Sequence, residues 1–196
     1  MPLRRRELSA KATRSEIISV ARVAFAAKGY AAVKLEDVAR SAHATTGAIY
    51  HHFGGKSGLL LAVGEHVEQE VVTAIGERIP PGASPWAAIE AAARATLDLC
   101  SRPEVARIIF KEAPNVLGTA AWREVELRYG LGGLQALFQR ASDAGQLTPD
   151  NPALVTRLVM AALIEAVEWI VEGGGERAQA EAAGEAVSRI LSALRP

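Results

Sequence analysis

The sequence has a single cysteine and no long uninterrupted apolar run. Cys100 alone excludes an internal disulfide framework, and no Cys/His cluster has the spacing of a structural zinc site. No apolar run reaches the ~18 residues of a membrane span, and no apolar segment of a signal peptide follows the basic N-terminus. We therefore expect a cytoplasmic protein that has no membrane partner.

The sequence also lacks the alternating apolar pattern of a strand, an internal repeat and any recognisable catalytic constellation. We expect an all-α protein that is not an enzyme and needs no cofactor. His51 and His52 invite a metal interpretation, but adjacent side chains on a helix diverge by about 100°. Neither His43 nor His66 completes a ligand motif, so we expect no metal.

Net charge is zero, but the charges are unevenly distributed. Residues 1–56 contain ten Lys or Arg and four acids, a net charge of +6, so the remainder carries −6. A basic nucleic-acid-binding segment before an acidic body would give this pattern, and so would ordinary clustering of solvated charges. Arg4–Arg6, in a flexible basic arm over residues 1–12, would enter a minor groove, neutralise phosphates or stay in a solvated tail.

The stretch from Lys34 to Leu60 has the pattern of a helix-turn-helix. Two short blocks of apolar residues at helical spacing, over 35–42 and 49–53, flank the polar segment 43–45. In the second block Thr46, Gly47, Tyr50 and His51 share a face that is left for a partner. A capping box predicts that the preceding helix begins at Thr13, and Gly29 predicts its end.

Further helices are expected after this stretch. They cover Lys56 to about Arg78, Ser84 to Cys100, a short piece from Arg102, one helix or two over 119–144, and two long ones at about 153–172 and 176–194. Gly130, Gly132 and Gly133 predict a kink or a close helix contact. Residues 153–172 are apolar on nearly all faces, which fits either an internal core or a subunit interface. Glu165 and Glu168 lie on this helix, either at a solvated edge or buried with partners.

Three segments near the N-terminus, TRSEIISVARVAFAAKGY, LEDVARSA and TTGAIYHHFGGKSGLL, resemble the DNA-binding domain of the TetR family of bacterial transcription regulators. EAPNVLG and WREVE are similar to a C-terminal type found in some members. The resemblance implies a three-helix DNA-binding domain, here residues 1–56, and a helical ligand-binding and dimerisation domain, here 57–196. It also implies a homodimer formed through the last two long helices.

The resemblance assigns DNA contacts where residues match. Tyr50, His52 and Lys56 correspond to phosphate-holding positions, and Thr45, Thr46, Gly47 and His51 to positions that approach bases. Three residues depart from the family pattern. Lys34 replaces a capping Thr and gains a possible phosphate contact, His43 replaces a Gly at a turn position that favours positive φ, and Gly55 replaces a polar cap.

These features lead to one functional hypothesis and one alternative. The hypothesis is a homodimeric, ligand-responsive regulator of double-stranded DNA, acting as a repressor that a small lipophilic effector releases from a near-palindromic operator. The alternative is a helical small-molecule-binding or scaffold protein without specific DNA binding. Six residues either line the effector pocket or form ordinary core: Cys100, Phe110, Trp122, Tyr129, Phe138 and Trp169.

Overall fold

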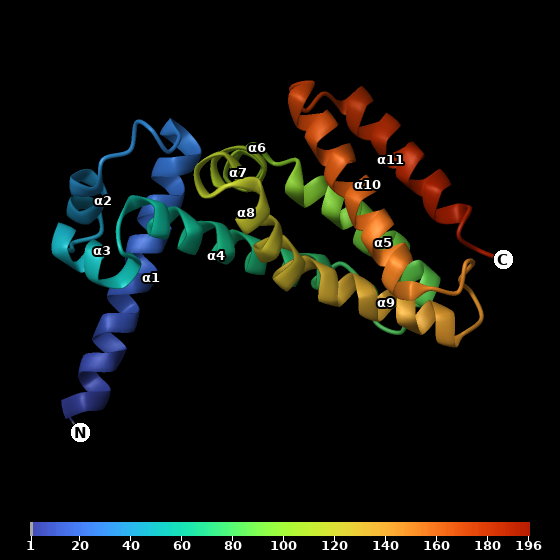
Figure 1. Cartoon of the computed structure of the whole chain (residues 1–196), viewed down its shortest axis with the longest axis horizontal. Helices are drawn as coiled ribbons and strands as arrows, with labels where there is room; N and C mark the ends of the chain where they lie inside the picture. Colours follow the sequence, from blue (N-terminus) through green and yellow to red (C-terminus); the bar gives the residue numbers. More distant parts are fainter. Residues whose placement is uncertain (1) are drawn as a thin grey trace. The chain divides into compact units, whose positions relative to one another are not determined.

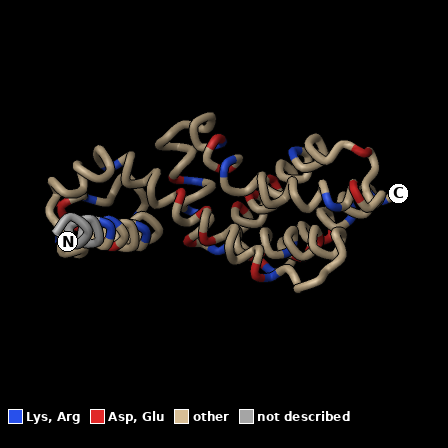
Figure 2. Tube along the Cα trace, turned by 90° about the horizontal axis from the view of Figure 1, so that it is seen from below, with Lys and Arg blue, Asp and Glu red and all other residues tan. Residues whose placement is uncertain are grey.

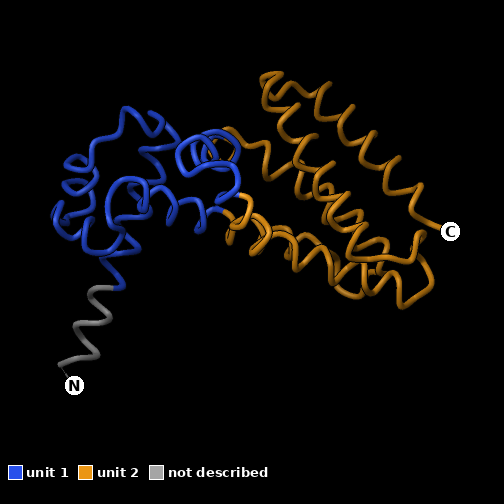
Figure 3. The backbone as a smooth tube through the Cα atoms, viewed as in Figure 1, with its two compact units in different colours: residues 1–67, 107–122 blue, residues 68–106, 123–196 orange. Residues whose placement is uncertain are grey.

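A computed structural model describes the backbone of residues 2–196 and the side chains of residues 11–196. The described chain is helical, contains no strand and forms two compact units (Figure 3). Unit 1 consists of residues 1–67 and 107–122, and unit 2 of residues 68–106 and 123–196. The expected all-α fold is confirmed. Residues 57–67 and 107–122 group with the helix-turn-helix in unit 1.

Unit 1 contains α1 (Pro2–Lys28), α2 (Leu35–Ser41), α3 (Thr46–Phe53) and the first part of α4 (Lys56–Glu77) (Figure 1). Its second segment contains the π-helical turn η1 (Arg107–Glu112), α7 (Ala113–Leu117) and the start of α8 (Thr119–Glu126). The core of the helix-turn-helix comes from side chains that are at most 2% exposed: Ile17, Ala21, Phe25, Val38, Ile49, Leu59, Leu60 and Val63.

Helix α1 does not begin at Thr13, so that prediction is wrong. Lys11 and Ala12 are already helical, and both are strong helix formers that continue the helix through the capping-box sequence. The predicted end is confirmed, because α1 stops at Lys28 and Gly29 follows at φ 78°. The side chains of residues 1–10, and with them the predicted role of the basic arm, lie outside the described residues.

Unit 2 contains the rest of α4, α5 (Pro85–Cys100), α6 (Pro103–Ala106), the π-helical turn η2 (Leu127–Leu131), α9 (Gly132–Asp143), α10 (Pro152–Glu172) and α11 (Arg177–Ser192). Helix α5 packs against α9, α10 and α11, and α10 also packs against α9 and α11. The predicted cap at Ser84 is confirmed, since its Oγ accepts a hydrogen bond from the amide of Ala87 at 3.3 Å.

The stretch predicted as one helix or two is helical from Thr119 to Asp143. It consists of α8, η2 and α9, which follow one another directly. The expected close contact is also present. A side chain at Gly130 would place its Cβ 3.2 Å from the Met160 methyl group on α10, which is tighter than ordinary packing. Among the described residues no helix, α10 included, is both long and apolar enough to cross a membrane.

Candidate nucleic-acid interface

Helix α2 ends in a tight turn that requires an unusual backbone conformation. Its Leu35, Val38 and Ala39 are buried, and the chain reverses at His43, whose φ of 49° lies in the left-handed region. The amide of Ala44 then donates to the carbonyl of Ala39 at 2.9 Å and closes the turn. The expectation of positive φ at His43 is confirmed, and the imidazole is exposed.

Thr45 caps the N-terminus of α3. Its backbone is extended, and its Oγ1 accepts a hydrogen bond from the amide of Ala48 at 3.1 Å. This bond satisfies one of the amides that have no partner within the helix. The hydroxyl keeps its hydrogen for a further acceptor, so Thr45 can both fix the helix and approach DNA.

One side of α3 anchors the helix and another is exposed. Ile49 is fully buried, whereas the Tyr50 side chain is 58% exposed and Gly47 and His51 are also exposed. Thr46, the other residue of the predicted face, is half-buried. A Cβ at Gly47 would meet only the Thr45 hydroxyl, at 3.8 Å, so no described side chain of unit 1 blocks close approach to this stretch of backbone.

Two glycines separate α3 from α4. Gly54 adopts φ 74° and donates its amide to the carbonyl of Tyr50 at 2.9 Å, which is a left-handed helix end. Gly55 adopts φ 136°, a conformation that side-chain-bearing residues rarely take, and its carbonyl accepts from the amide of Leu59 at 3.0 Å. The departure from a polar cap at Gly55 therefore has a conformational reason.

Lys56 is held by its own unit. Its Nζ donates to the carbonyl of Ala31 at 3.2 Å and lies 4.4 Å from the centre of the Tyr30 ring. An ammonium group has three donors, so Lys56 can keep these contacts and still donate to a phosphate. His52 is half-buried, with its ring 6.0 Å from that of Phe53.

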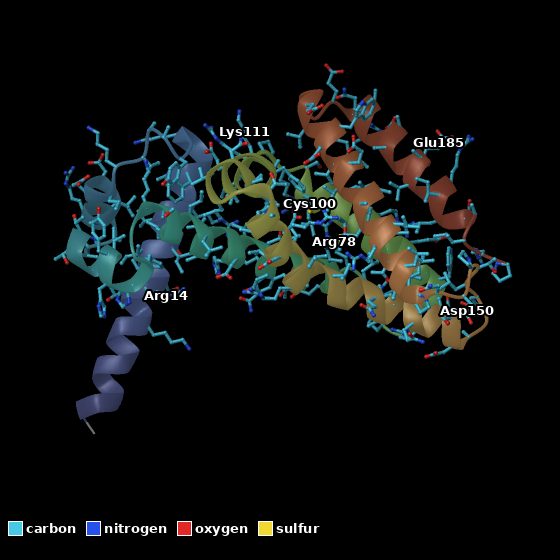
Figure 4. All side chains as sticks on the ribbon, viewed as in Figure 1. Arg14, Arg78, Cys100, Lys111, Asp150 and Glu185 are labelled. Atoms are coloured by element: carbon cyan, nitrogen blue, oxygen red, sulfur yellow. The ribbon has the colours of Figure 1, made fainter. Side chains whose placement is uncertain are left out.

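Basic side chains occur on several elements of unit 1. Figure 2 shows Lys and Arg positions along the described part of α1, and Figure 4 shows Arg14 there. The Arg14 guanidinium lies 5.3 Å from the centre of the Phe53 ring at the end of α3. Lys34 is exposed at the start of α2 and makes no side-chain cap, as its replacement of Thr predicts. These cations give the helix-turn-helix donors for phosphate oxygens.

The six predicted effector residues are divided between the units. Phe110 and Trp122 belong to unit 1, and Cys100, Tyr129, Phe138 and Trp169 belong to unit 2. Phe138 is fully buried, Trp169 is 47% exposed, and Phe110 and Tyr129 are half-buried.

Trp122 packs on α4, where a Cβ added to Gly64 would lie 2.6 Å from the indole ring. The indole N–H has no hydrogen-bond partner among the described residues, although it is buried. Gly64 is therefore the residue that makes room for Trp122 in unit 1.

One buried acid in unit 2, Glu68, was not predicted from the sequence. Glu68 is only 8% exposed, and burial, followed by the nearby Glu126 carboxylate, raises its pKa to about 8. Burial and the same two acids raise the pKa of the Cys100 thiol to about 12. The available signal was that Glu68 follows Leu60 and Gly64 at four-residue steps, which places an acid beside the apolar stripe of α4.

The two acids noted on α10 differ in their surroundings. Glu165 is exposed, whereas Glu168 is half-buried, and burial followed by Glu165 and Glu172 raises its pKa. The solvated edge is therefore the better description of Glu165. Within the described part of the chain, no group of three or more His, Cys, Asp or Glu side chains could hold a metal ion.

The buried side of α2, the left-handed turn and the exposed side of α3 define a helix-turn-helix DNA-binding protein. Residues 17–63 match the bacterial regulatory proteins of the tetR family, and residues 86–194 match the tetracyclin repressor-like C-terminal domain. The chain belongs to the TetR family of bacterial transcription regulators.

Individual relatives agree with this assignment. The TetC protein of transposon Tn10 from Escherichia coli is 27% identical over 137 residues, which cover 70% of this chain and 69% of TetC. The regulator TtgR from Pseudomonas putida is 43% identical over 61 residues, 31% of this chain and 29% of TtgR.

Solved structures agree as well. A TetR-family regulator from Pectobacterium atrosepticum is 30% identical, with a TM-score of 0.84 over 96% of each chain. RolR in complex with resorcinol shares the fold, with a TM-score of 0.73 at 18% identity over 94% of this chain and 89% of RolR. The protein is therefore a DNA-binding transcription regulator and not an enzyme.

Proposed function

We propose that this regulator binds a near-palindromic operator as a homodimer and is a repressor that a small lipophilic effector releases. The observation that carries the proposal is the division of α3 into a buried anchor, Ile49, and an exposed side with Gly47, Tyr50 and His51. Such a helix can enter a major groove without disturbing its own unit.

The residues of the interface divide into two roles. Thr45, Thr46, Gly47 and His51, near the N-terminal part of α3, read base edges. Lys34, Tyr50, His52 and Lys56 hold phosphates, which fixes the position of the helix but carries no sequence information. The caps at Thr45 and Gly54 support this division because they fix both ends of α3.

The exposed side of α10 and α11 supports the homodimer. On α10 Leu154, Leu158 and Trp169 are 48%, 60% and 47% exposed, and on α11 Ile190 is 46% exposed. Leu158 lies one turn after Leu154 and Trp169 three turns after Leu158, so all three share one side of the helix. On α11 the exposed Ala182 and Ala186 precede Ile190 at four-residue steps, which leaves room for a close helix contact.

A dimer formed by this surface would be symmetric, because each copy offers the same patch. Two α3 helices would then read half-sites ~34–36 Å apart or a multiple of that distance. Sedimentation at micromolar concentration tests the surface. The wild type should sediment as a dimer, and Leu158→Glu should shift it to a monomer. A wild-type monomer would overturn this part of the proposal.

Unit 2 is the proposed effector-binding region, with Cys100, Tyr129 and Phe138 as lining candidates. The raised pKa of Glu68 indicates apolar surroundings in which the carboxyl group stays protonated at neutral pH. A lipophilic molecule would meet no buried negative charge there. Effector and operator would oppose each other through one conformational equilibrium, and each would weaken the other's binding by the same factor.

DNA selection tests the function. Wild-type protein should enrich a near-palindromic duplex from a random pool, and its affinity for that duplex should fall steeply as salt rises. The lipophilic dye N-phenylnaphthylamine, titrated into the complex, tests release. Failure to enrich any duplex would overturn the regulator proposal and favour a helical small-molecule-binding or scaffold protein. A dye that binds the protein without weakening the complex would count against lipophilic release.

A further inference from the structure

The segment Arg107–Trp122 packs in unit 1, although the chain on both sides of it belongs to unit 2. It also lies within the stretch that matches the C-terminal domain of the family. The segment opens with the π-helical turn η1, from Arg107 to Glu112. In such a turn each amide bonds to the carbonyl five residues earlier, and π-helical turns are frequent at functional sites. The two end residues of η1 contact the C-terminal end of α1 and the turn that follows it.

Arg107 caps the C-terminus of α1. Its Nη1 donates to the carbonyls of Ala26 and Ala27, both at 3.1 Å, across about 80 residues of sequence. The last carbonyls of a helix have no partner within the helix, and a cation is favourable beside them. A single guanidinium therefore satisfies two acceptors at the point where α1 ends.

Glu112 holds Tyr30, two residues after the end of α1. Its Oε2 accepts a hydrogen bond from the amide of Tyr30 at 3.0 Å, while its Oε1 lies 3.4 Å from Nε of Arg107. The Glu112 side chain is 14% exposed, so solvent screens these contacts weakly. Between them lies Gly29, where an added Cβ would be 2.7 Å from both Arg107 Nη2 and Glu112 Oε1.

Tyr30 connects this pair to the interface. Its ring stacks on Phe25 at 5.9 Å and lies 4.4 Å from Nζ of Lys56, and that same Nζ donates to Ala31 at 3.2 Å. Lys56 is the first residue of α4 and follows the two glycines that end α3. The position of the Gly29–Ala31 turn therefore influences where the Lys56 ammonium sits.

We propose that Arg107 and Glu112 are positioning residues for DNA binding. Together they form a clasp, the Arg107–Glu112 clasp, that fixes the Gly29–Ala31 turn and through it Lys56. The segment that carries the clasp is continuous in sequence with unit 2 at both ends. A second role rests on the proposed effector response. Through the clasp a rearrangement of unit 2 would reach the helix-turn-helix.

The test compares Glu112→Ala with Glu112→Gln. The alanine variant has no acceptor for the Tyr30 amide, whereas glutamine keeps one amide oxygen and loses the charge. Affinity is measured for the duplex that the wild-type protein selects, and for a scrambled duplex of equal length. We expect Glu112→Ala to bind the selected duplex about tenfold more weakly, the loss expected for a charge-assisted hydrogen bond, and Glu112→Gln to recover most of it.

Two further measurements separate positioning from mere stability. Urea unfolding defines conditions in which each variant is fully folded, where a loss of stability alone leaves DNA affinity unchanged. Hydrogen exchange of the Tyr30 amide should accelerate in Glu112→Ala and recover in Glu112→Gln. Arg107→Lys, which keeps the charge but loses the two-carbonyl contact, provides a second variant should Glu112→Ala fail to fold.

The matched control is Asp98→Ala, which removes the exposed pair with Arg78 in unit 2, at 2.6 Å, and should leave affinity unchanged. Folded Glu112→Ala and Arg107→Lys variants with wild-type affinity would overturn the clasp. So would a weakening equal to that of Asp98→Ala. A wild-type protein that selects no duplex would instead overturn the proposed function, so the two failures are distinguishable.

Discussion

The helix-turn-helix of unit 1 and the helical body of unit 2 treat their polar groups differently. In unit 1 the Thr45 hydroxyl, the Lys56 ammonium and the Glu112 carboxylate each have a defined partner at 3.0–3.2 Å. In unit 2 burial, followed by the nearby Glu126 carboxylate, raises the pKa of the buried Glu68 to about 8. These three groups of unit 1 fix a surface through hydrogen bonds. Unit 2, in contrast, contains an acid, Glu68, whose charge changes near pH 8.

The largest effect is expected from removing Ile49, the buried anchor of α3 in unit 1. Ile49 is fully buried, so Ile49→Ala should lower the free energy of unfolding by about 2–5 kcal/mol and abolish operator binding. Urea unfolding and gel shift measure the two effects. Val23→Ala, on the exposed side of α1, is the control, because Val23 is 67% exposed. Equal effects of the two variants would mean that α3 is not held by its core contact.

Glu68→Gln tests whether the buried acid of unit 2 makes stability depend on pH. The folded pKa is about 8 and the unfolded value 4.5, so between these pH values the folded chain binds more protons. Stability should therefore fall as pH rises through this window, by at most about 1.4 kcal/mol per pH unit, and stay constant below it. The neutral glutamine should remove this slope and make the protein more stable at pH 8.

Unfolding midpoints from pH 5 to pH 8 check this sign. Glu70→Gln is the control, because Glu70 is an exposed acid on the same helix. A Glu68→Gln variant whose stability changes with pH as the wild type's does would show that the pKa of Glu68 is not raised in the folded state.

Tyr50→Ala tests whether positioning and reading are separate within unit 1. Because Tyr50 is exposed, its stability cost should be small. Binding should weaken about tenfold for operator and scrambled duplex alike, as expected for a phosphate contact, whereas Thr46→Ala or His51→Ala should change sequence preference. Competition gel shifts measure both. The reverse result would show that the roles assigned to the two parts of α3 must be exchanged.

Lys34→Thr should have the smallest effect. Lys34 makes no side-chain cap on α2, and a threonine oxygen can accept from the first turn, so stability should rise by about 1 kcal/mol. Affinity for any duplex should fall slightly, with a shallower salt dependence, because one cation is lost. Thermal unfolding and a salt titration are sufficient. Unchanged affinity would remove Lys34 from the interface.

Local chemistry predicted much of the helix-turn-helix. Gly29 could be placed from sequence because a glycine after a basic last turn ends a helix, and His43 because the family it resembles has a Gly at that turn position; the structure confirms both. The start of α1 was wrong because a capping box can also occur inside a helix, where neighbouring helix formers override it.

The contacts that escaped prediction are long-range. The bonds of Arg107 and Glu112 to Ala26 and Tyr30 each join residues about 80 positions apart, and no helical period reports them. Glu68 escaped for a different reason, since its place beside the apolar stripe of α4 does not tell whether a neighbouring helix covers it. In both cases the missing information is which elements pack together.

The π-helical turn η2 accommodates one extra residue in the helical stretch from Thr119 to Asp143. Such a turn contains one residue more than an α-helical turn. Deleting one residue between Leu127 and Leu131 would therefore turn η2 into an α-helical turn and leave α9 facing its neighbours as before, with Phe138 in the interior. Deleting one residue from the regular helix between Gly132 and Phe138 would instead rotate the rest of α9 by about 100° and carry Phe138 out of the interior. The extra residue of η2 thus makes this turn the place where the helix can lose a residue without losing its core.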